Sequence, residues 1–217
     1  MKEENKYIPA LKYHWLTNFY DWLICNFFPE KEFKSALLKQ ANILDGHAVL
    51  DFGCGTATLT IMAKQNQPLA KLTGVDVDEK ILSIAREKLK KTKNGIQIDK
   101  YDGDVLPYRD SSFDRVITSL VFHHLTKEQK ENSLKEIKRV LKPDGELHIA
   151  DWGKAENFLM RFLFFFIQLL DGFKTTTDNV KGLLPDYMNT AGFNNVKIAK
   201  NYSTIFGTLT LYKATKN

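Results

Sequence analysis

Short apolar runs alternate with segments of helical periodicity through the middle of the chain. Apolar runs that predict buried strands occur at 47–52, 71–76, 96–101, 113–119 and 146–150. Between them, apolar positions that recur every three or four residues predict helices over 56–64, 78–90 and 126–141. Alternation at this spacing predicts a parallel sheet with helices on both faces.

The end of the chain has a different pattern. A helix is predicted over 178–190, and two strands, 193–200 and 205–213, follow it with only four residues between them. That link is too short for a parallel crossover, so these two strands are predicted to be antiparallel neighbours.

The length of 217 residues predicts a single domain in four parts. The predicted parts are an N-terminal helical lid (1–46), an alternating body (47–151), an apolar helical insert (152–174) and a C-terminal part (175–217). Hydrophobic residues make up 43% of the chain, which excludes a disordered chain.

Composition and charge narrow the function classes. No uncharged apolar run reaches about 18 residues, and the N-terminus has no apolar core of a signal peptide, so neither a transmembrane helix nor a leader is predicted. The two cysteines, Cys25 and Cys54, make no disulfide framework, and a reducing cytoplasm is expected. The net charge of +5 is scattered among acidic residues, so no nucleic-acid partner is expected.

A glycine-rich loop links the first predicted strand to the first helix, in the sequence VLDFGCGTAT at 49–58. Gly53 and Gly55 let the backbone approach a ligand, and a tight turn without a ligand is the alternative. A dinucleotide site would place a third glycine where Thr58 stands. Asp51 would repel a pyrophosphate but suits a cationic ligand.

Acidic residues also end the next two predicted strands. Asp76 can accept hydrogen bonds from both hydroxyls of a ribose, although it could also cap the helix for which Asp78 is the better cap. Asp104 can accept from an adenine amino group while the Val105 N–H faces a ring nitrogen, or it could form an Asx-turn before Pro107. Carboxyl ends of neighbouring parallel strands are where ligands bind in open α/β sheets.

Five stretches, taken in order, resemble the class I S-adenosylmethionine-dependent methyltransferases. They are VLDFGCGTAT (49–58), GVDVD (74–78), YDGDVLPY (101–108), SFDRVITSLVFHHL (112–125) and RVLKPDGELHIAD (139–151). The resemblance implies a doubly wound α/β fold with a mostly parallel seven-stranded sheet in the order 3-2-1-4-5-7-6 and the last strand antiparallel. It implies S-adenosylmethionine as cofactor and S-adenosylhomocysteine as product.

The resemblance also implies roles for single residues. Gly53 and Gly55 would line the methionine and ribose, Asp51 would lie near the α-amino group, and the Ser119 backbone would face that group. Asp76 would hold the ribose, and Asp104 with Val105 the adenine. The cofactor-binding positions so implied are Tyr20, Asp51, Gly53, Cys54, Gly55, Asp76, Val77, Gly103, Asp104, Val105 and Ser119.

Two histidines, His123 and His124, follow the fourth predicted strand, beside the expected position of the donor methyl. Either could remove a proton from the acceptor, and a structural role is the alternative. Cys54 could be an activated thiol or a small packed residue of the loop. No Cys/His cluster has metal-ligand spacing, so no metal is expected.

The predicted reaction is methyl transfer by in-line displacement, driven mainly by positioning, to a small lipophilic or aromatic acceptor. Residues 1–28 and 158–173 contain 14 of the 26 aromatic residues. They could form an acceptor pocket, contact a membrane surface through 158–170, or simply pack against each other. The chain resembles quinone and phospholipid methyltransferases, but it lacks the Asn-Asp and His-Arg signatures of the quinone enzymes.

Two other functions stay open at this point. A binding module could keep the fold and hold an S-adenosyl ligand without catalysis. A nicotinamide-dependent oxidoreductase is disfavoured by Thr58, Asp51 and the antiparallel C-terminal strands.

Overall fold

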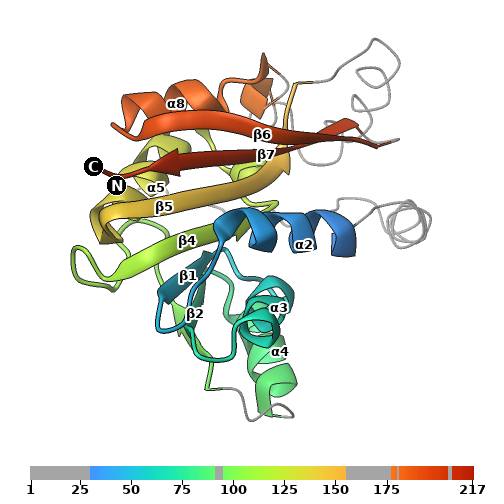
Figure 1. Cartoon of the computed structure of the whole chain (residues 1–217), viewed down its shortest axis with the longest axis vertical. Helices are drawn as coiled ribbons and strands as arrows, with labels where there is room; N and C mark the ends of the chain where they lie inside the picture. The colour runs from blue at the N-terminus through green and yellow to red at the C-terminus, as the bar shows by residue number, and fades with distance from the viewer. Residues whose placement is uncertain (1–29, 91–94, 155–176, 180, 205–206) are drawn as a thin grey trace, which may run out of the picture.

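A seven-stranded mixed sheet runs through the protein, with helices packed against it (Figure 1). The computed structural model describes residues 30–90, 95–154, 177–179, 181–204 and 207–217. The aromatic segments 1–28 and 158–173, Tyr20 and nearly all of the predicted insert 152–174 lie outside these residues. Within the part of the chain that the structure describes, no helix is long and apolar enough to cross a membrane.

The sheet has the order β3-β2-β1-β4-β5-β7-β6, as predicted. Its strands are β1 (Ala48–Phe52), β2 (Lys71–Asp76), β3 (Gln97–Lys100), β4 (Phe113–Ser119), β5 (Leu141–Trp152), β6 (Asn194–Thr204) and β7 (Gly207–Thr215). The first five pair in parallel, and β7 is antiparallel to both β5 and β6. The parallel strands place their carboxyl ends at one edge of the sheet.

The described helices are α2 (Glu30–Ala41), α3 (Thr58–Asn66), α4 (Glu79–Lys90), α5 (Lys127–Val140) and α8 (Leu184–Thr190), with a 3₁₀ turn at Phe122–His124. Asp78 caps α4, because its Oδ1 accepts from the backbone N–H groups of Lys80 and Ile81. Thr126 and Gln129 form a capping box at the start of α5. The predicted caps at both helices are therefore confirmed.

Two hydrophobic clusters lie on opposite faces of the sheet. One joins α5 and α8 to the sheet and includes Leu134, Ile137 and Met188. The other joins α2 and α3 to the sheet and includes Phe33, Leu37 and Leu59. Burial on both faces explains why the parallel strands are continuous apolar runs in the sequence.

Several predicted boundaries are wrong, and three of the errors have a backbone cause. Helix α3 begins at Thr58, two residues late, because Ala57 adopts a left-handed conformation with φ of 61°. Strand β5 begins at Leu141, five residues before the predicted start, because residues 142–145 form an irregularity within its pairing to β4. The predicted helix 178–190 is interrupted at Gly182, which has φ of 73°, so that α8 begins at Leu184.

Candidate functional site

The glycine-rich loop folds back over the end of β2. The N–H groups of Gly53 and Cys54 both donate to the Val75 carbonyl, at 2.9 and 3.0 Å. Gly53 has φ of 70°, and a Cβ atom there would lie 2.4 Å from a methyl of Val121. Around Gly55, which has φ of 53°, the nearest such contact is 4.0 Å away. Gly53 is thus required by a close approach within the protein, whereas a Cβ atom at Gly55 would make only an ordinary van der Waals contact with Ile81.

Asp76 connects the loop to β2. Its Oδ2 accepts from the Gly55 N–H at 2.9 Å and its Oδ1 accepts from the Asp78 N–H at 3.1 Å. A carboxylate has about four lone-pair sites, so both oxygens retain the capacity to accept from a ligand. Because Asp78 caps α4, Asp76 is not needed as the cap.

Asp51 is fully buried at the end of β1, with 1% of its surface exposed. Burial raises its pKa to about 6, opposed by the hydrogen bond that Thr60 Oγ1 donates at 2.6 Å and by the charge of Lys34. The charge of Asp76 raises the pKa further. A cation bound near Asp51 would favour its ionised form.

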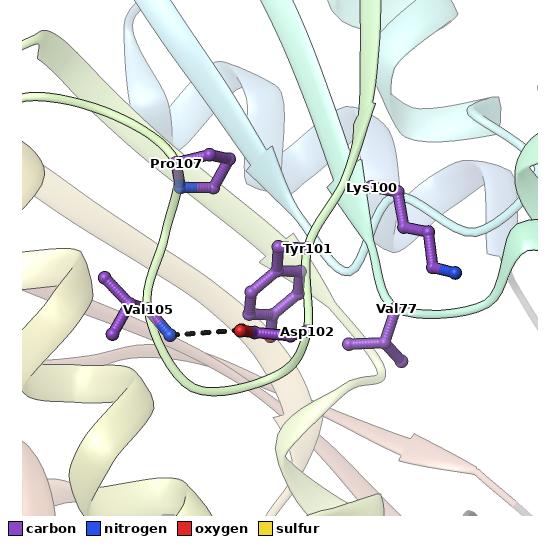
Figure 2. Close-up of a pocket in the computed structure, with 6 residues that line it drawn as sticks. All are labelled: Val77, Lys100, Tyr101, Asp102, Val105 and Pro107. Atoms are coloured by element: carbon purple, nitrogen blue, oxygen red, sulfur yellow. Dashed lines mark hydrogen bonds between the residues drawn. The ribbon is translucent and has the colours of Figure 1, made fainter.

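The loop after β3 corrects one prediction. The Asx-turn belongs to Asp102, whose Oδ1 accepts from the N–H groups of Asp104 at 3.0 Å and Val105 at 3.4 Å (Figure 2). The Val105 N–H donates the longer of these two bonds, and its predicted role in facing a ligand stays a prediction. Asp104 is left exposed. Gly103 has φ of 98°, which the turn requires and which glycine adopts at little cost.

A cavity of about 600 Å³ opens beside this loop. Its lining residues come from the ends of β2 and β3 and from the following loop, and they are Val77, Lys100, Tyr101, Asp102, Val105 and Pro107 (Figure 2). Burial and the charges of Asp76, Asp102 and Asp104 all raise the pKa of Tyr101. Asp76 and Asp104 therefore act on the same side chain of this cavity.

Sequence reasoning missed Lys100, Tyr101, Asp102 and Pro107 in this lining. The strand register carries a signal for the first two, because Asp76 pairs with Lys100 and the Tyr101 N–H donates to the Asp76 carbonyl at 3.2 Å. The parallel pairing of β2 with β3 therefore places Lys100 and Tyr101 beside Asp76, at the same edge of the sheet.

Helix α5 fixes the course of the cavity loop. The Leu106 N–H donates to Glu136 Oε2 at 2.8 Å. Arg139 donates to the carbonyls of Leu106 at 3.0 Å and Tyr108 at 2.8 Å, and to Asp110 and Glu136. Side chains of α5 thus hold main-chain groups of the loop that carries Val105.

Strand β4 ends in a tight turn that carries Ser119 and the two histidines. Ser119 Oγ is buried and has no hydrogen-bond partner in the part of the chain that the structure describes. Leu120 has φ of 59°, and its N–H donates to the Ala150 carbonyl at 2.8 Å. His123 is 4% exposed, and its Nδ1 lies 2.8 Å from Oδ1 of Asp151, a residue that sequence reasoning did not single out.

The structure distinguishes the two histidines. The ring of His124 lies against that of His123, with centroids 3.8 Å apart. Protein packed around the ring and the charge of His123 lower the pKa of His124 to about 3, although part of the side chain is exposed. The lowered pKa disfavours a protonated His124.

Cys54 packs inside the loop. A Cβ atom on Gly74 would lie 2.9 Å from its Sγ, and burial raises the pKa of the thiol. The buried position of Cys54 favours the packed-residue interpretation over the activated thiol. Within the described ranges no group of three or more His, Cys, Asp or Glu side chains could hold a metal ion.

Comparisons with known proteins agree with this geometry. Residues 49–145 match the family model described as a methyltransferase domain. A demethylmenaquinone methyltransferase from Lactobacillus johnsonii is 34% identical over 131 residues, which cover 59% of this chain and 53% of that protein. An uncharacterized methyltransferase from Bacillus licheniformis is 30% identical over 154 residues, 67% of each chain.

Solved structures share the fold. Phosphoethanolamine N-methyltransferase 2 from Haemonchus contortus, in complex with S-adenosyl-L-methionine, superposes with a TM-score of 0.69 at 16% identity, over 91% of this chain and 56% of that chain. This likeness concerns the fold alone. The alignments span about half the length of the first curated relatives.

Proposed function

The chain belongs to the class I S-adenosylmethionine-dependent methyltransferases, and on that premise we propose that it transfers a methyl group from S-adenosylmethionine to a small lipophilic acceptor. The observation that carries the proposal is Asp76, which joins the glycine loop to the end of β2 beside the cavity. The alternative is a module that binds the same ligand without catalysis, and the experiments below distinguish the two functions.

The proposed cofactor site follows from charge and space. Asp76 would accept from the two ribose hydroxyls with the lone pairs that its backbone donors leave free. The cavity between Val77 and Val105 would take the adenine, with exposed Asp104 as acceptor for its amino group. Binding there would require the Val105 N–H to exchange its long 3.4 Å contact with Asp102 for a ring nitrogen.

The methionine end would lie over the glycine loop. The uncrowded backbone at Gly55 would admit it, and the backbone of Ser119 would face its amino group. Asp51 would stabilise that positive charge from below, which offsets the cost of ionising a buried carboxylate. Tyr20, which lies outside the described residues, stays a predicted closing residue.

The mechanism assigned to the protein is mainly positional. The cofactor supplies an electrophilic methyl group on a sulfonium, which needs no metal ion. The chain would fix the methyl donor at the edge of the sheet and exclude water. Such positioning can lower the activation barrier by about 7–11 kcal/mol at best. Asp151 holds Nδ1 of His123, so the neutral form of His123 would have Nε2 available to take an acceptor proton.

For the acceptor we propose an aromatic, quinone-like small molecule. The relatives named demethylmenaquinone methyltransferase support this class, whereas the missing N-terminal signatures argue against the same quinone. A membrane contact through 158–170 is proposed from sequence alone. Flotation with liposomes, with and without anionic lipid, tests it, and absence of binding to both would contradict it.

The ribose assignment is tested with Asp76→Ala. The protein is expected to bind S-adenosylhomocysteine at micromolar affinity, and the substitution to weaken binding at least tenfold, because two charge-assisted hydrogen bonds are lost. Titration calorimetry measures this. Asp78→Ala is the matched control: it removes the cap of α4 two residues away, at a cost of about 1 kcal/mol, but keeps the backbone N–H that donates to Asp76, so it should leave the affinity unchanged.

Catalysis is tested separately. Incubation of the purified protein with a labelled donor and a cell extract should transfer label into a lipid-soluble product. Binding of S-adenosylhomocysteine without any transfer would favour the module, and unchanged affinity in Asp76→Ala would contradict the assignment of the ribose to that carboxylate.

A further inference from the structure

A second carboxylate, Asp151, occupies the carboxyl end of β5. It is fully buried, with 0% exposure. Its Oδ2 accepts from the N–H groups of Val121 at 3.1 Å and Phe122 at 2.7 Å. Its Oδ1 accepts from the Trp152 N–H at 2.7 Å and lies 2.8 Å from Nδ1 of His123. One side chain therefore holds three consecutive residues of the turn after β4.

The charge on this carboxylate is maintained by its partners. Burial alone would raise the pKa of Asp151, but the charge and hydrogen bond of His123, with the bond from Trp152, outweigh burial and lower it. A buried charge is costly unless it is fully hydrogen-bonded, and removal of one partner costs more than the pair gains. A carboxylate at this position is thus stable only while its hydrogen-bond partners are kept.

The turn that it holds is strained. Leu120 has φ of 59°, a left-handed conformation that costs a residue with a Cβ atom about 1–2 kcal/mol. Such conformations persist where surrounding contacts determine them and are frequent at functional sites. The bonds of Asp151 begin at the next residue, Val121.

Val121 connects the turn after β4 to the glycine-rich loop. Its side chain lies so close to Gly53 that a Cβ atom on that residue would meet it at 2.4 Å. The Gly53 N–H in turn donates to the Val75 carbonyl, next to Asp76. A continuous series of contacts therefore links Asp151 to the loop, although none of the bonds of Asp151 is to the loop itself.

We propose that Asp151 is a positioning residue: by holding the Val121–His123 turn, it sets the course of the glycine loop through Val121 and fixes His123 at the end of β4. This inference rests on the proposed function in so far as the loop binds S-adenosylmethionine. It couples the donor side of the site, at Gly53, to the acceptor side, at His123.

The substitution Asp151→Asn tests the coupling. It replaces one acceptor oxygen by an NH₂ group, so at least one of the backbone N–H groups of Val121, Phe122 and Trp152 loses its acceptor. We expect at least tenfold weaker binding of S-adenosylhomocysteine in titration calorimetry. Glu146→Gln is the matched control, because Glu146 lies in the middle of β5, five residues before Asp151, and contacts His148, Lys213 and Arg115 instead of the turn; its affinity should stay within about threefold of the wild type.

A further variant separates the turn from the ring. His123→Asn keeps a donor for Asp151 but removes the imidazole, so it should bind S-adenosylhomocysteine within about threefold of the wild type and lose methyl transfer. Affinity lost equally in His123→Asn and Asp151→Asn would overturn the route through Val121.

Hydrogen exchange at the Gly53 and Cys54 amides tests the inference without any ligand. Exchange should accelerate at least tenfold in Asp151→Asn and stay unchanged in Glu146→Gln. Unchanged exchange in both would overturn the positioning role, even if the protein bound no S-adenosyl compound and the proposed function failed. Should Asp151→Asn not fold, Val121→Ala interrupts the same contacts nearer the loop and should accelerate the same amides; unaltered exchange there would overturn the inference.

Discussion

At the scale of single residues, the site is a set of buried or half-buried carboxylates whose partners differ. Asp76 is held by the backbone N–H groups of two residues and Asp151 by several donors, whereas the donors to Asp51 both belong to one residue, Thr60. Asp51 has the fewest partners, and burial raises its pKa to about 6. Its ionisation therefore costs stability in the absence of a cationic ligand.

Asp51→Asn should stabilise the unliganded protein above pH 6. A raised pKa means that the folded state binds the proton more tightly, so the wild type loses stability as pH rises from about 4 to about 6, by about 3 kcal/mol in all. The amide avoids this cost and keeps an acceptor for Thr60. Urea unfolding at pH 4 and pH 8 measures the difference, which should be small at pH 4.

The same substitution should weaken binding of S-adenosylhomocysteine, because an amide does not balance an amino cation. Thr60→Val is a useful comparison, since it removes the hydroxyl donor but keeps the carboxylate, and it should lower stability at pH 8. An Asp51→Asn protein that is less stable than the wild type at pH 8 would contradict the interpretation of Asp51 as a destabilising buried charge.

At the scale of elements, helix α5 organises the cavity. Its first turn is closed by the capping box of Thr126 and Gln129, and its last turn carries Arg139. Arg139 uses its guanidinium to hold two carbonyls of the loop after β3, and Glu136 holds an N–H of the same loop. The loop's shape thus depends on a helix some 30 residues later in the chain.

Arg139→Met should disorganise the cavity loop. The aliphatic stem is kept, but the bonds to the Leu106 and Tyr108 carbonyls are lost. We expect a lower melting temperature and at least fivefold weaker binding of S-adenosylhomocysteine. Lys135→Ala, one turn earlier on the exposed face of α5, is the control. A variant that loses stability but binds with wild-type affinity would show that the loop does not depend on Arg139 for binding.

At the scale of the whole molecule, parallel pairing brings distant segments to one edge. The carboxyl ends of β1, β2 and β3 carry Asp51, Asp76 and the Asp102 turn, and those of β4 and β5 carry His123 and Asp151. The two core clusters on opposite faces hold the sheet rigid beneath this edge. A ligand at the edge would contact several loops at once.

A ligand that binds only the folded state should stabilise the whole protein by mass action. S-adenosylhomocysteine at 100 times its dissociation constant is expected to add about 2.7 kcal/mol to the free energy of unfolding. Thermal unfolding across a ligand titration measures this, with adenine alone as the weaker comparison. A melting temperature independent of S-adenosylhomocysteine would contradict binding at the edge.

Much of the fold was predictable, because hydrophobic periodicity, caps and the short link between the last strands are local signals. The strand order and the caps of α4 and α5 are confirmed. The boundary errors at Ala57 and Gly182 arise where single residues adopt left-handed conformations, and at Ala57 the residue type gives no warning of this. Propensity describes average conformations, whereas tertiary contacts fix these individual ones.

By itself, the sequence determined that Asp51, Gly53, Asp76 and Asp104 would stand at strand ends on one edge, because alternation and parallel pairing depend on side-chain pattern alone. Only the tertiary structure decided which partner each group has. In the folded protein the Val105 N–H donates to Asp102, the pKa of His124 is lowered beside His123, and Asp151 bonds the turn after β4. Hydrogen bonding and burial depend on distances between segments far apart in the chain, which no local pattern encodes.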